Sequence, residues 1–126
     1  MEQPRMRISA TVLDAPDPPA LGDFYARLLG WTVVESEATW TMVRPPSGGT
    51  GLSFQLEPEY VPPVWPAVRD EQLMMSHLDI AVDDLEVAVV WALEAGARLA
   101  DHQPQEHVRV MLDPAGHPFC LFPGEV

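Results

Sequence analysis

An imidazole and a carboxylate stand two residues apart in His77-Leu78-Asp79. This pair lies in the run 75–82, where apolar and polar side chains alternate, and residues two apart on a strand face the same side. Such a histidine could serve as a general base, a metal ligand or a structural imidazole. Neighbours at i and i+2 lie side by side, so a direct His–Asp bond stays open. We expect His77 to contact a pocket, with catalysis or metal binding as its alternative roles.

Other side chains could join this pair around a ligand. Leu52–Leu56 also alternates, with Ser53 and Gln55 on the polar side and its leucines and Phe54 on the core side. Large apolar residues could form pocket walls, although core or interface packing explains each equally well. The candidates are Trp40, Phe54, Trp65 and Met74 or Met75.

The elements that position His77 and Asp79 can be read from the pattern around them. After the strand, Asp83 or Asp84 supplies an N-cap oxygen for a helix over 84–95, and Gly96 suits its C-cap. The apolar residues of this helix fall at i, i+3, i+4, i+7 and i+8, which is the spacing of one helix face. They are Leu85, Ala88, Val89, Ala92 and Leu93.

The same strand–helix unit occurs earlier in the chain. A strand over 6–13 precedes a helix over 19–29, and the Asp17-to-Gly30 spacing equals that from Asp83 to Gly96. Further strands are expected at 31–35, 39–43, 52–56, 98–100, 107–112 and 119–122. The pattern predicts an α+β fold of two tandem βαβββ modules, forming paired curved sheets with helices on their outer faces. The concave cleft opposite the helices would be lined by His77, Asp79, Ser53 and Gln55.

One domain of 126 residues accommodates both modules: the first over about 6–56, a linker over 57–73 and the second over about 74–123. The linker contains four prolines, which prevent a regular helix in its first half. It also contains Trp65, and an exposed tryptophan in a linker would be unusual. We therefore expect this segment to lie across an apolar surface at the rim of a pocket.

Composition narrows the function classes. The formal charge is −12, with seven arginines and no lysine, which argues against nucleic acid and anionic membranes and allows neutral or cationic ligands. A single cysteine permits no internal disulfide and fits a reducing, cytoplasmic setting. We find no secretory signal and no apolar run long enough to span a membrane.

Four segments resemble the vicinal oxygen chelate superfamily, which includes glyoxalase I, bleomycin-resistance proteins and extradiol dioxygenases. The resemblance is greatest to glyoxalase-like domain proteins. The segments are Asp17–Trp31 (Asp-x6-Phe-Tyr-x3-Leu-Gly-Trp), His77–Leu85, Leu93–Ala97 and Asp113–Leu121 (Asp-Pro-Ala-Gly-His-Pro-Phe-Cys-Leu).

The resemblance implies four metal-ligand positions, which fall here on Ala10, Gln55, His77 and Cys120. Ala10 cannot ligate, Gln55 is a weak neutral ligand and His77 is a good one. Cys120 could bind a soft metal as thiolate or be a buried core residue. The two-histidine, one-carboxylate set of non-haem iron enzymes is not assembled.

Two function classes follow. The first is a small-molecule-binding protein without a tightly held metal or other cofactor, with a ligand site formed by Trp40, Phe54, Gln55, Trp65, His77, Asp79 and Cys120. The second is a glyoxalase-type lyase or isomerase, in which Gln55 and His77 hold a divalent ion whose remaining ligands come from a partner or the substrate, with His77 as the candidate catalytic residue. A metal-free enzyme with His77 as base lies between them, and a module that binds no ligand is a third class. The resemblance also implies a homodimer.

Overall fold

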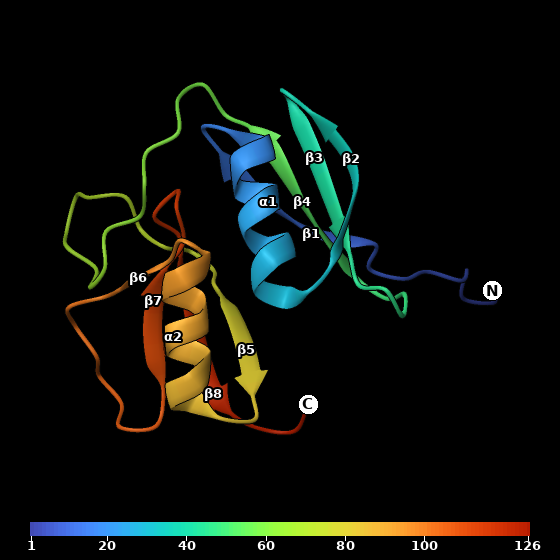
Figure 1. Ribbon diagram of the computed structural model, residues 1–126. Coiled ribbons are helices and arrows are strands. Elements are labelled where there is room, and N and C mark those ends of the chain that lie inside the picture. Colours follow the sequence, from blue (N-terminus) through green and yellow to red (C-terminus); the bar gives the residue numbers. More distant parts are fainter. The chain divides into compact units, whose positions relative to one another are not determined.

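The computed structural model describes all 126 residues. The chain divides into two compact units, Met1–Pro58 and Glu59–Val126, which we call the first and second modules and describe in turn. In each module one helix packs on its own mixed four-stranded sheet (Figure 1). The two modules have the same order of elements, one βαβββ unit each, as the sequence predicted.

The first module has sheet order β1-β4-β3-β2, with β1 parallel to β4 and the other pairs antiparallel. Asp17 is the N-cap of its helix, and Gly30 ends the helix in the left-handed conformation. The elements are β1 (Ala10–Ala15), α1 (Pro18–Leu29), β2 (Thr32–Glu37), β3 (Trp40–Arg44) and β4 (Gly51–Leu56).

An aromatic core fills the space between α1 and its sheet. Phe24 and Tyr25 of the helix are fully buried, and the Tyr25 ring stacks on Phe54 of β4 at a centroid distance of 5.6 Å. The helix approaches the sheet closely at Gly22, where a methyl group would collide with Thr41 of β3. Side-chain volume in this module is therefore used for packing.

The second module repeats the topology as β5-β8-β7-β6, with the edge strand β5 parallel to β8 and the other pairs antiparallel. The buried turn residue Asp113 accepts hydrogen bonds from the backbone N–H groups of Ala115 and His117 and so fixes the connection between β7 and β8. The elements are β5 (Leu78–Val82), α2 (Leu85–Ala95), β6 (Arg98–Leu99), β7 (Arg109–Leu112) and β8 (Pro118–Pro123).

Several local predictions need correction. Of the two candidates, Asp84 is the N-cap of α2, so α2 is one residue shorter than α1 and the equal Asp-to-Gly spacings do not both run from N-cap to C-cap. Leu93 is 44% exposed and does not belong to the buried face of α2. On β4 the expected alternation also fails, because Ser53 is buried and Leu56 is exposed.

Neither helix has the length and apolar character needed to cross a membrane.

Candidate functional site

A pocket of about 140 Å³ lies on the second module and is built entirely from its residues. A cavity of similar volume, about 150 Å³, holds benzene in an engineered protein, so this pocket can take one ring or a short branched chain. Its lining is mainly apolar, with His77, Gln105 and Cys120 as the polar or titratable members. The full lining is Trp65, Met74, His77, Pro104, Gln105, Val110, Pro118 and Cys120.

Strand register brings the chemistry-bearing residues together. Asp79 of β5 and Val110 of β7 are both direct neighbours of Cys120 on β8, so the three lie in one row across the sheet. Side chains in such a row share a face. Leu121, the next residue of β8, is buried on the opposite side, where α2 packs. The row is therefore on the face that the helix leaves uncovered.

His77 and Asp79 contact each other directly, which the sequence alone left open. The His77 Nε2 atom lies 3.0 Å from Asp79 Oδ1, with the two side chains 35% and 63% exposed. His77 precedes the first paired residue of β5, and Met75 has a positive φ of 61°. The backbone at Met75 departs from strand geometry, and the His77 imidazole contacts the Asp79 carboxylate.

Cys120 completes the cluster. Donor atoms of His77, Asp79 and Cys120 all lie within 4.8 Å of one another. Partial burial raises the pKa of the Cys120 thiol, and the negative charge of Asp79 and its hydrogen bond with the thiol raise it further. The sulfur is therefore a protonated thiol at neutral pH, and Asp79 is the acceptor shared by thiol and imidazole.

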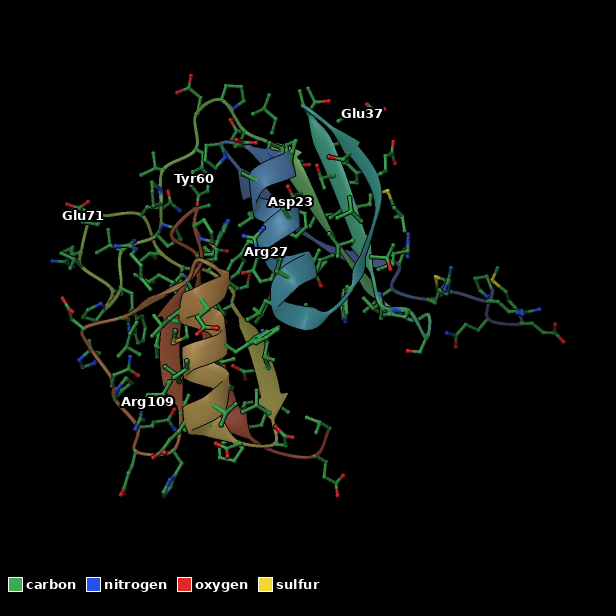
Figure 2. All side chains as sticks on the ribbon, in the orientation of Figure 1. Asp23, Arg27, Glu37, Tyr60, Glu71 and Arg109 are labelled. Atoms are coloured by element: carbon green, nitrogen blue, oxygen red, sulfur yellow. The ribbon has the colours of Figure 1, made fainter.

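The segment between the modules supplies one wall of the pocket. Trp65 Nε1 donates a hydrogen bond to the backbone oxygen of His102 at 3.1 Å, which fixes the indole at the pocket. Tyr60 anchors the start of the segment by donating to the backbone oxygen of Ala115 at 2.7 Å; it is labelled in Figure 2. This segment thus belongs to the second module from Glu59 onward. Trp65 lines the pocket, and the sequence predicted that this segment lies at the rim of a pocket.

The loop 101–108 supplies another part of the lining, and Gln103 holds this loop in place. Its amide nitrogen donates to the backbone oxygens of Ala100 and Val110, and its oxygen accepts from Val110 N–H, each at 2.8 Å. These bonds attach the loop to β7 and present Pro104 and Gln105 to the pocket.

The site residues predicted on the first module lie in different surroundings. Phe54 is fully buried in the core under α1. Gln55 is exposed and donates a hydrogen bond to Asp14 Oδ1 at 2.8 Å, and Trp40 is the neighbour of Gln55 across the sheet. Their contact with a ligand stays a prediction, as does a cleft shared by the two sheets.

Sequence reasoning did not assign Gln103, Pro104, Gln105, Val110 or Pro118 to the site. The one available signal was register: any β7 residue paired with Cys120 must share its face. No comparable signal exists for Gln103, because its partners are backbone groups reached through a loop.

Comparison with known families identifies the family of the chain. The family model described as a glyoxalase-like domain matches residues 10–122, nearly the whole chain. The chain belongs to the glyoxalase-like domain family. The resemblance seen in the sequence is thereby confirmed, and comparison with curated proteins gave no match.

Solved structures share the fold of this glyoxalase-like domain at low identity. Protein ATC0852 of Agrobacterium tumefaciens is 20% identical, with a TM-score of 0.70 over 97% of this chain and 100% of its own. The trypanothione-dependent glyoxalase I of Leishmania major is 17% identical, with a TM-score of 0.63 over 94% and 87%. A bleomycin resistance determinant from transposon Tn5 is 18% identical, with a TM-score of 0.62 over 96% and 100%. An enzyme and a resistance protein thus share the architecture, so the fold alone does not choose between them.

The glyoxalase-like domain could hold a metal ion only through a modified ligand set. Of the four family positions, Ala10 offers no ligand atom and the Gln55 amide is bonded to Asp14. His77 and Cys120 are joined by Asp79, which gives one nitrogen, one oxygen and one sulfur donor within 4.8 Å. Zinc accepts these donor types, and catalytic zinc sites commonly have three protein ligands. The donor set therefore fits a zinc-like ion, provided that Cys120 loses its proton.

Proposed function

We propose that this glyoxalase-like protein binds a small, mainly apolar organic molecule in the pocket of its second module. The observation that carries the proposal is the mainly apolar pocket whose lining includes two members, His77 and Cys120, of one titratable cluster. Small-molecule sites are typically concave and apolar, with a few convergent polar groups that orient the ligand. At about 140 Å³ the pocket would enclose one end of a ligand and leave the rest outside.

Each wall would have a separate task. Trp65, Met74 and the pocket prolines would contact the apolar part of the molecule, and the indole is already fixed by its bond to His102. His77 would donate or accept one hydrogen bond to a polar group of the ligand. This preorganisation would reduce the entropy lost on binding.

Binding of benzyl alcohol, followed by NMR titration of the protein, tests this proposal. His77→Ala should weaken binding about threefold or more, the effect of losing one modest hydrogen bond, with little change in melting temperature. His107→Ala, an exposed histidine outside the pocket lining, is the matched control and should bind as the wild type does. A large loss of stability with unchanged affinity would show His77 to be a structural residue.

The donor cluster favours a second candidate, a metal-dependent lyase or isomerase. A divalent ion held by His77, Asp79 and Cys120 would supply Lewis-acid stabilisation of a developing oxyanion. In that case the thiol proton of Cys120 would be released to solvent when the sulfur becomes a ligand.

Metal analysis of protein purified without chelators, before and after soaking in zinc, nickel, manganese and iron(II), tests this candidate. Near-stoichiometric metal that is lost in both His77→Ala and Cys120→Ser, and kept in His107→Ala, would support it. Retention of no ion under any soak would reject it.

A further inference from the structure

The charges around the pocket of the second module extend the proposed function. We propose that the pocket selects an organic cation, namely an ammonium or other onium group on a ring-sized apolar body, with Asp79 as its counter-ion. This inference depends on the proposed function, because it names the ligand class of the same pocket.

Asp79 lies beside the pocket, next to two of its lining residues. It is the direct neighbour of Cys120, a lining residue, and it contacts His77, a second lining residue. Its partners are an imidazole and a thiol, neither of which carries a permanent positive charge. With 63% of its side chain exposed, the carboxylate can reach a ligand without moving through packed atoms.

The basic group in contact with that carboxylate is the His77 imidazole, and no guanidinium competes for it at the pocket. No arginine is among the lining residues. Arg109, the residue beside Val110 on β7, donates from its guanidinium to the backbone oxygens of Glu106 and Val108 at 2.8 and 3.0 Å; Figure 2 shows it near the loop. The cation that Asp79 lacks from the protein can therefore come from the ligand.

The charge of the whole module acts in the same direction. Residues 59–126 contain twelve acidic side chains and three arginines, which gives a formal charge of −9, whereas residues 1–58 contain seven and four, which gives −3. An acidic surface attracts cations and repels carboxylates or phosphates. The asymmetry places most of this field on the module that has the pocket.

The walls suit a cation that also carries apolar surface. Trp65 presents an indole, the side chain with the strongest cation–π attraction, and its N–H is already engaged with His102. Met74 adds a polarisable thioether that adapts to the shape of a ligand. A small inorganic cation would leave this apolar surface unused, whereas an aromatic or branched amine would cover it.

Three probes of similar size separate charge from shape: benzylamine, benzyl alcohol and benzoate, each titrated by NMR with EDTA present to remove divalent ions. Benzylamine should bind about tenfold more tightly than benzyl alcohol, the value of one charge-assisted hydrogen bond, and benzoate should bind most weakly. In Asp79→Asn the amine-to-alcohol ratio should approach one. Glu94→Gln, which removes one charge from α2, should keep the wild-type ratio.

The outcomes separate this inference from the proposed function. Equal binding of amine and alcohol to the wild type overturns cation selection but still supports the proposed function, an apolar ligand pocket. An amine preference that survives Asp79→Asn also overturns it, because the attraction then comes from general surface charge. Failure of all three probes to bind contradicts the proposed function and this inference together. The wild-type comparison needs no variant, so it holds even if Asp79→Asn is poorly folded.

Discussion

The two modules use one topology for different purposes. Ala10 lies seven residues before the N-cap Asp17, and His77 lies seven residues before the N-cap Asp84. Strand register also makes Ser53 the counterpart of Cys120. Val12, two residues after Ala10, pairs with Ser53, and Asp79, two residues after His77, pairs with Cys120. The second module has a histidine, a carboxylate and a thiol where the first has alanine, valine and serine.

The loops that connect the strands also differ between the two modules. In the first module β2 and β3 are joined by a short turn, and the large side chains lie in the core beneath α1. In the second module β6 has two residues, and the loop that follows it, with the segment 59–73, supplies the pocket walls. A repeated scaffold thus fills one module with a packed aromatic core and forms a pocket on the other through its loops.

The largest expected effect tests whether the first module is the packing module. Phe54→Ala removes a fully buried ring that stacks on Tyr25, and it should reduce the free energy of unfolding by about 4 kcal/mol in urea titration. Benzyl alcohol affinity of the folded protein should not change. Leu56→Ala, on the exposed end of the same strand, is the control and should cost less than about 1 kcal/mol. Lost binding with little loss of stability would make Phe54 a ligand contact.

An intermediate effect tests how the loop builds the pocket. Gln103→Ala removes three hydrogen bonds, two to Val110 and one to Ala100, and should cost about 2 kcal/mol of stability. The same change should weaken benzyl alcohol binding about threefold, because Pro104 and Gln105 lose their attachment. Gln72→Ala, whose exposed amide donates to the adjacent residue, should leave both quantities nearly unchanged. Unchanged binding in Gln103→Ala would separate the loop from the site.

The smallest effect concerns the thiol of Cys120, whose counterpart in the first module is the hydroxyl of Ser53. Because burial, and after it the charge and hydrogen bond of Asp79, raise the pKa of Cys120, the wild-type thiol should react slowly with iodoacetamide at pH 7 and faster as the pH rises above the usual range for thiols. Asp79→Asn removes the charge, lowers the pKa and should speed alkylation at pH 7 about threefold. Glu94→Gln is the control. Equal rates in the wild type and Asp79→Asn would mean that burial alone sets the reactivity.

The sequence predicted the elements well because their signals are local. Asp17 and Asp84 accept the N-cap hydrogen bonds, and alternation located β5 and β8 to within a few residues. Buried Ser53 and exposed Leu93 were misplaced because burial depends on which strands and helices cover a side chain, and the period alone does not report that.

The site was less predictable for a similar reason. His77 and Asp79 were visible as a pair because they share a strand face. Their contact depends on the side-chain conformations, and the walls depend on hydrogen bonds from Trp65 and Gln103 to backbone oxygens. Such contacts do not appear in the periodicity of the sequence. Aromatic residues that pack in a core also cannot be distinguished by sequence from those that line a pocket.

One measurement tests the central claim that the ligand site belongs to the second module. Backbone amide and indole resonances would be assigned, and benzyl alcohol titrated while chemical shifts are recorded. The account predicts that the perturbed signals cluster at the Trp65 indole and at Met74, His77, Val110 and Cys120. Perturbations centred on Asp14, Trp40 and Gln55 of the first sheet would contradict it.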